Sequence, residues 1–210
     1  MGDRHAGLGQ RPATGMSAIE LSFDLHGVSI PADYPHKLWE ALLRIAPALS
    51  ESVEVGVIPL RGPNNNGELL LPKRAKLALR LPLAMLNAAQ TLSGQELQIG
   101  TGTLRLGQGK TREIQPYSTL HAHLVVGPSD EAEFMVMVDA ALAALEVSCK
   151  LICGRYHSLN TDRQAISGFS LVMHDLKPED SLRVQYAGMG TARNLGCGIF
   201  VPYKVISGLE

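Results

Sequence analysis

The sequence predicts an α+β protein in which the order β-α-β-β-α-β occurs twice in succession. Alternating apolar and polar residues mark the strands, and apolar residues at helical spacing mark the helices between them. The second run of elements begins near residue 118 and repeats the order of the first. Two such units are the pattern of tandem ferredoxin-like domains. We therefore expect a disordered lead over residues 1–16, one domain over 17–110, and a second domain over 111–210 that carries a glycine-rich loop.

The first half supplies a strand, a helix, two strands, a helix and a strand, over residues 19–25, 33–47, 53–60, 75–82, 83–94 and 97–107. The first strand alternates apolar and polar residues without a break, which favours a sheet with one buried face. In the first helix, Pro35 suits the opening turn and Pro47 closes the segment. The polar stretch 61–68 contains no apolar residue and predicts a connection between the two middle strands. Gly94 ends the short second helix.

The second half supplies the same order over residues 118–126, 129–147, 148–154, 165–176, 177–190 and 196–205. Ser129 can cap the first of its helices, and acidic residues follow in the first turn. Pro178 and its acidic neighbours begin the second helix in the same way. The polar stretch between the two middle strands, residues 155–164, predicts the loop of a β-hairpin.

The composition is that of an ordinary soluble globular protein, with 45% hydrophobic and 19% charged residues among 210. A formal net charge of −1 excludes a basic coat over the whole chain but leaves room for a local basic groove. The sequence has neither an apolar run long enough to cross a membrane nor the core of a signal peptide. Three unevenly spaced cysteines are too few for a disulfide framework or a zinc site. We therefore expect a cytoplasmic protein without a membrane anchor, a metal or a small-molecule cofactor.

A glycine-rich stretch, residues 186–200, lies between the last helix and the last strand and contains a single arginine. A dinucleotide-binding loop would need a strand before the glycines and a helix after them, and a Walker loop would need Gly-Lys-Ser/Thr. Neither pattern is present. Two interpretations stay open: the glycines form a helix cap and a tight turn, or their bare backbone binds phosphates together with the arginine fork. The residues concerned are Gly188, Gly190, Arg193, Gly196 and Gly198.

This stretch, "GMGTARNLGCGIF", resembles the C-terminal glycine-rich signature of the RAMP superfamily. Three further segments strengthen the resemblance: "SFDLHGVSIPADYPHKLWEALLRIAP", "GVIPLRG" and "GFSLVMHDLKPEDSLRVQYAGMG". The resemblance covers nearly the whole chain, roughly residues 17–204. The chain is similar to a compact variant of the CRISPR-associated repeat-cleaving endoribonucleases, the sixth Cas family.

The resemblance implies tandem RRM-like RAMP domains that bind a hairpin CRISPR repeat RNA and cut it once without metal. Attack by the ribose 2′-hydroxyl would leave a cyclic phosphate and a 5′-hydroxyl, and the products would be guide RNAs. Other CRISPR effector subunits are the protein partners it implies. Two alternatives remain: a non-cleaving RAMP subunit that holds guide RNA, and a small-molecule enzyme or sensor on the same scaffold.

Cleavage without metal needs groups that take and give protons near neutral pH, and histidine can do both. His36 falls in the first turn of the first helix, on its polar side, where helix N-terminal amides attract phosphate and favour a neutral imidazole. The resemblance implies a catalytic histidine in or just before this helix. Members of the compact branch carry it two positions earlier, where this chain has Tyr34. We therefore expect His36 as general base or acid, with Tyr34 orienting the phosphate or acting as a weak acid.

Further residues are candidates for RNA contact because of their charge and place. Two histidines share one face of the first strand of the second half, one basic cluster precedes the strand 75–82, and two arginines flank the predicted hairpin loop. The alternative for each is an ordinary solvated side chain. These candidates are His121, His123, Lys73, Arg74, Arg155 and Arg163.

Overall fold

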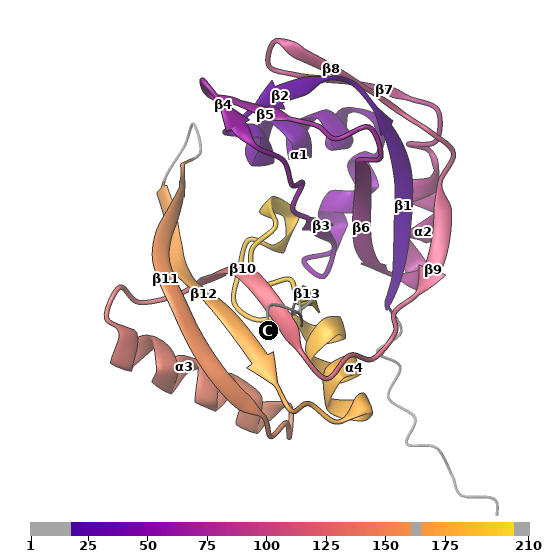
Figure 1. The fold of residues 1–210 in the computed structure, drawn as a ribbon. Helices are drawn as coiled ribbons and strands as arrows, with labels where there is room; N and C mark the ends of the chain where they lie inside the picture. Colours follow the sequence, from indigo (N-terminus) through magenta and orange to yellow (C-terminus); the bar gives the residue numbers. More distant parts are fainter. Residues whose placement is uncertain (1–17, 161–164, 204–210) are drawn as a thin grey trace, which may run out of the picture.

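The computed structural model describes residues 18–160 and 165–203 and shows two halves, each built on its own antiparallel sheet (Figure 1). The first half is drawn in indigo to rose and the second in rose to yellow. The predicted lead, residues 1–16, lies outside the described residues.

The first half holds most of the short strands. They are β1 (Ala18–His26), β2 (Ser29–Pro31), β3 (Gly56–Ile58), β4 (Asn64–Asn65), β5 (Glu68–Leu70), β6 (Lys76–Pro82), β7 (Glu96–Ile99), β8 (Gly102–Leu106) and β9 (Lys110–Glu113). The helices are α1 (Tyr34–Ile45) and α2 (Leu86–Gln90), with 3-10 turns η1 (Pro47–Glu51) and η2 (Leu83–Met85). The main sheet has the order β3-β6-β1-β8-β7, with β9 also paired to β1, while β2, β5 and β4 form a separate small sheet.

The second half is simpler. It contains β10 (Leu120–Val126), α3 (Glu131–Ala144), β11 (Lys150–Asn160), β12 (Ala165–His174), α4 (Pro178–Ala187), η3 (Arg193–Leu195) and β13 (Val201–Pro202). Its sheet has the order β11-β12-β10-β13. In both halves the two central strands are the first and the third of the β-α-β-β-α-β unit: β1 and β6 in the first half, β10 and β12 in the second. The second and fourth strands of each unit lie on either side of this pair. The predicted tandem ferredoxin-like fold is therefore confirmed.

Each half has its own apolar core. In the first half the strand alternation buries Leu21 and Phe23 completely against the apolar stripe of α1. In the second half Phe134 of α3 packs on Phe169 of β12, with ring centroids 4.8 Å apart. Burial of these large apolar side chains is the main driving force for the folding of each half.

Several predicted elements have different limits in the structure. The segment 53–60 gives only the short strand β3, because residues 53–54 form a turn before it. The segment 97–107 is a hairpin of β7 and β8, with Gly100 at φ 58° in the turn. Strand β9 crosses the predicted boundary at residue 110 and adds to the first sheet through β1. The cap of α3 is Asp130, one residue later than expected, and its side chain accepts a hydrogen bond from the Glu133 amide.

The polar stretch 155–164 is not simply a loop. Strand β11 continues through its first part to Asn160 and pairs with β12, so the two strands form one long hairpin. The register shifts between Cys153 and Tyr156, which marks a β-bulge. This bulge lies beside the cavity described below.

The glycine stretch forms tight backbone turns inside the second half. Gly188, Gly190, Gly196 and Gly198 all have positive φ, a conformation that side-chain-bearing residues rarely adopt. An added Cβ at Gly188 would lie 2.5 Å from Nη1 of Arg193, so the bare backbone makes room for this guanidinium. Arg193 donates to the carbonyl oxygens of Tyr186 and Ala187 and thereby caps α4.

We predict that Gly198→Ala destabilises the protein by about 3 kcal/mol, because the new Cβ would lie 1.8 Å from the Met189 carbonyl oxygen at φ 63°. The matched control is Gly67→Ala, which has φ 82° but no atom within 4 Å of the added Cβ. The control should lose only about 1 kcal/mol. Urea denaturation of both variants measures the difference, and equal losses would contradict the steric explanation.

A buried ion network joins the two halves. Arg80 of β6, fully buried, contacts Glu20 of β1 through Nη2 and Oε1 at 2.6 Å. Its Nη1 donates to the carbonyl oxygens of Gln185 and Phe200 in the second half, at 3.1 and 2.6 Å. Arg112 of β9 binds the other carboxylate oxygen of Glu20 at 2.5 Å. One guanidinium therefore fixes the position of one half on the other.

Candidate functional site

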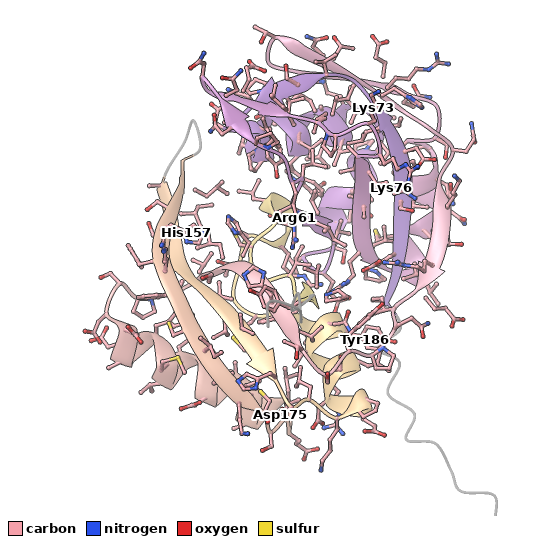
Figure 2. The ribbon with its side chains drawn as sticks, viewed as in Figure 1. Arg61, Lys73, Lys76, His157, Asp175 and Tyr186 are labelled. Atoms are coloured by element: carbon pink, nitrogen blue, oxygen red, sulfur yellow. The ribbon has the colours of Figure 1, made fainter. Side chains whose placement is uncertain are left out.

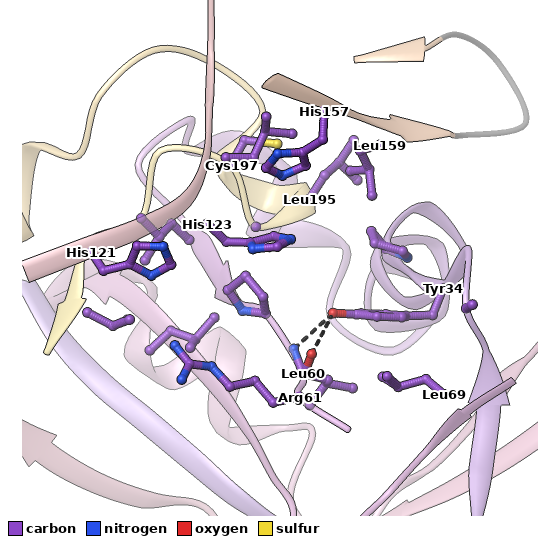
Figure 3. Close-up of a pocket in the computed structure, with 18 of the residues that line it drawn as sticks. Tyr34, Leu60, Arg61, Leu69, His121, His123, His157, Leu159, Leu195 and Cys197 are labelled. Carbon is purple, nitrogen blue, oxygen red and sulfur yellow. Dashed lines mark hydrogen bonds between the residues drawn. The ribbon is translucent and has the colours of Figure 1, made fainter. Parts of the chain in front are cut away.

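A cavity of about 470 Å³ lies where the two halves meet, and both contribute to its wall (Figure 3). From the first half come the start of α1 and the segment 58–62, which runs from the last residue of β3 into the following coil. From the second half come β10, β11, the end of the glycine stretch and the residues around β13. A volume of this size fits a small organic group such as one nucleotide.

Three imidazoles line this cavity, and they come from two strands of the second sheet that are separated by β12. His121 and His123 belong to β10, and His157 belongs to β11 just beyond its bulge. The rings of His123 and His157 have centroids 4.7 Å apart. His121 lies next to Tyr203, with ring centroids 5.5 Å apart.

Burial and neighbouring cationic groups favour the neutral form of two of these imidazoles. The pKa of His123 is lowered from its usual value of 6.5, first by burial and then by His157 and Arg61. The pKa of His121 is lowered by burial and then by His123, Arg61 and His157. A neutral imidazole at neutral pH can accept a proton from a bound hydroxyl.

The tautomer of His157 follows from its hydrogen bond. Its Nδ1 lies 3.1 Å from the carbonyl oxygen of Arg155. Because a carbonyl oxygen only accepts, Nδ1 carries a hydrogen, and in the neutral ring the lone pair is then on Nε2. This Nε2 is buried and has no hydrogen-bond partner among the described residues.

Arg61 brings a positive charge to the same cavity, and Tyr34 fixes the segment that carries it. The Tyr34 hydroxyl accepts a hydrogen bond from the Leu60 amide at 2.9 Å and lies 3.4 Å from the Leu60 carbonyl oxygen. Burial raises the pKa of Tyr34 to about 12. The phenol therefore stays neutral at ordinary pH and holds the main chain beside Arg61. Together, the arginine and the imidazoles can bind an anion and exchange protons with it.

Comparisons with known proteins agree with the resemblance found in the sequence. The family model described as "Cas6 Crispr" matches residues 19–205. A curated relative, "CRISPR-associated endonuclease Cas6" of Myxococcus xanthus (strain DK1622), is 37% identical over 189 residues, which is 89% of this chain and 82% of the relative. The chain belongs to the Cas6 family.

Solved structures agree with this Cas6 fold. One is described as a Cas6-related gene product from Pyrococcus furiosus and has a TM-score of 0.61 at 14% identity, covering 92% of this chain and all of that one. Another, "An RAMP protein binding different RNA substrates", has a TM-score of 0.60 at 14% identity, covering 87% of this chain and 98% of the other. At this identity the similarity concerns the fold alone.

In this Cas6 protein, Tyr34 and His36, which the sequence analysis paired on the first helix, point in different directions. Tyr34 lines the cavity, whereas His36 is not among the described residues that line it. His36 lies in the first turn of α1, as predicted, and its Nδ1 is 3.4 Å from Oε1 of Glu40. Consecutive residues of a helix are separated by about 100°, so positions two apart point to opposite sides.

Four described residues of the glycine stretch line the cavity, Leu195, Gly196, Cys197 and Ile199, and Gly196 is the one glycine among them. Arg193, expected to present its charge to phosphates, is only 8% exposed and caps α4 instead. The structure therefore favours the turn-and-cap interpretation for Gly188, Gly190 and Gly198, whose φ angles and close neighbours require glycine.

The other predicted basic contacts lie in several places. Lys73 and Arg74 are exposed in the turn before β6, and Figure 2 shows Lys73 on the outer side of the first half, away from Arg61 and His157. Arg155 is exposed on β11. Arg163 lies outside the described residues.

Arg61 and His157 were not among the predicted site residues. The only signal for Arg61 was its place in "GVIPLRG", and His157 was part of a polar stretch with no periodicity. Among the described residues, no three His, Cys, Asp or Glu side chains are grouped so that they could hold a metal ion. In the same part of the chain, no helix has the length and apolar character needed to cross a membrane.

Proposed function

We propose that this Cas6 protein is a metal-independent endoribonuclease that binds hairpin CRISPR repeat RNA and cuts precursor CRISPR RNA into guide RNAs. The observation that carries the proposal is that His121 and His123, whose pKa values are lowered, lie beside Arg61 in a cavity large enough for one nucleotide. The Myxococcus relative is called an endonuclease, and the RAMP neighbour is described as binding RNA substrates. Both descriptions support the proposal.

The arrangement of β10 suits an in-line displacement at phosphorus. Residues two apart on a strand face the same side and are separated by about 6–7 Å, so His121 and His123 can flank one phosphate. His123 takes the proton from the 2′-hydroxyl as its oxygen forms a bond to phosphorus. A bound phosphate is a negative charge that favours the protonated form of His121, and this imidazolium gives its proton to the 5′-oxygen as the P–O5′ bond breaks. Arg61 binds the non-bridging oxygens and stabilises their developing charge.

In this proposal Tyr34 is a positioning residue, because its hydroxyl fixes Leu60 next to Arg61. The assignment of His36 as base or acid stays a prediction that competes with the β10 pair. Association with other CRISPR effector subunits and a cytoplasmic location also stay predictions.

Cleavage of a hairpin repeat RNA in EDTA tests the proposal. We expect one cut that gives a cyclic phosphate and a 5′-hydroxyl, and no cut when the nucleotide before the scissile phosphate carries a 2′-deoxyribose. Cleavage that requires added Mg²⁺, or cleavage of the deoxy RNA, would contradict the mechanism. Tight binding without any cleavage would instead favour the non-cleaving RAMP alternative.

A further inference from the structure

The cavity has two chemically different ends. Figure 3 shows Arg61 and His121 toward one end, and Leu159, Leu195 and Cys197 gathered at the other beside His157. The proposed chemistry uses the cationic end. The apolar end has no part in it.

The apolar end is the open side of a small apolar cluster that is separate from the two main cores. The buried members of this cluster include Leu124, Ile166 and Cys197, and Leu159 and Leu195 are partly buried against them. Partly exposed leucines that line a cavity favour an occupant with an apolar surface, because contact removes that surface from water. A phosphate would gain nothing from such walls.

The end also offers one polar feature. His157 presents an imidazole ring at this end, beside the leucines. The flat ring of a nucleobase matches this combination, because its face can contact both leucines and an imidazole.

We propose that the apolar end binds the nucleobase on the 5′ side of the scissile phosphate, in an unstacked conformation. This inference rests on the proposed function, because the cationic end fixes where the phosphate lies. The ribose joins the phosphate to its base, so a base held at Leu159 and Leu195 brings its sugar to the middle of the cavity. The 2′-hydroxyl is then next to His123, which lies between the two ends (Figure 3).

The consequence is a requirement for an accessible nucleotide at the cut. A base inside a stem must leave its stack to enter the cavity, whereas a base at the foot of a stem loses less stacking. Contact through a ring face tolerates any base, so the subsite selects an unstacked nucleotide more than a particular sequence.

Abasic RNA tests the subsite. After the cut site is mapped, single abasic sugars that keep the 2′-hydroxyl replace the nucleotide before the scissile phosphate or one three positions further 5′. We expect kcat/KM to fall at least tenfold for the first substrate and to change less than twofold for the second. Equal cleavage of both substrates would overturn the inference.

Two variants link the effect to the apolar end. Leu159→Gln should remove most of the difference in kcat/KM between normal RNA and RNA that is abasic before the scissile phosphate. Leu83→Gln should keep this difference, because Leu83 is a half-exposed leucine that is not among the described cavity residues. An unchanged difference in Leu159→Gln would place the base elsewhere.

The same test separates this inference from the proposed function. If no hairpin RNA is cut, the proposed function fails. The subsite can then still be tested by binding: each unpaired nucleotide, and each nucleotide at the foot of the stem, is replaced in turn by an abasic one, and the affinity for the protein is measured. A position whose abasic replacement weakens binding tenfold in the wild type, but not in Leu159→Gln, supports it. A flat scan overturns it.

Discussion

The variant His123→Ala is expected to lower kcat/KM for hairpin RNA cleavage by about 10²- to 10⁴-fold, the usual range for loss of a general base. His123 faces the cavity beside Arg61 and His157, and burial lowers its pKa below 6.5. The neutral imidazole therefore persists into mildly acidic solution. We expect the acidic limb of the kcat/KM profile to lie below pH 6.5. Single-turnover cleavage across pH measures both effects.

Two other histidine variants make this result specific. His26→Ala is the control, because His26 is exposed at the end of β1 and is not among the described cavity residues. His36→Ala tests the competing assignment on α1. If kcat/KM falls only in His36→Ala and not in His123→Ala, the proton transfer is assigned to α1 instead. The affinity of His26→Ala and His36→Ala for RNA should stay close to that of the wild type.

The sequence predicted the larger elements because their periods are set by burial. The alternation in residues 19–25 and the helical spacing after Pro35 both reflect one buried face, and the structure confirms both elements. The small sheet of β2, β5 and β4 was missed because strands of two or three residues contain no measurable period. The sequence pattern predicts only the first part of β11, because the second part is largely exposed and carries polar side chains on both faces.

The site was predictable only where one element decided the direction of a side chain. Alternation along β10 correctly placed His121 and His123 on the face that lines the cavity. Neither Arg61 nor His157 could be assigned in this way, because they approach from a coil segment and from beyond a β-bulge. For Arg193, composition indicated a phosphate ligand, whereas the fold uses the charge to cap a helix.

The second large effect concerns the buried ion network between the halves. We expect Arg80→Met to lower the free energy of unfolding by about 3–5 kcal/mol, because it leaves the Glu20 carboxylate, which is 5% exposed, without its buried partner. The carbonyl oxygens of Gln185 and Phe200 lose their donor at the same time. Guanidinium chloride denaturation measures this loss.

Arg112→Met is the matched control, since Arg112 binds the same carboxylate but its side chain is 70% exposed. Solvent screens such a pair, so its removal should cost only about 0–1 kcal/mol. Equal losses in the two variants would show that burial of Arg80 does not determine the strength of the network.

The network also predicts a pH dependence. Burial alone would raise the pKa of Glu20, but the charge of Arg80 and hydrogen bonds from Arg80 and Arg112 together lower it below its usual value of 4.5. A carboxyl group with a lowered pKa stabilises the folded state above its unfolded pKa, and this stabilisation is lost as the pH falls through the folded pKa. The wild type should therefore lose stability below about pH 4.5, and Glu20→Gln should lose less over the same range. A parallel decline of the two proteins would mean that other carboxylates control acid unfolding.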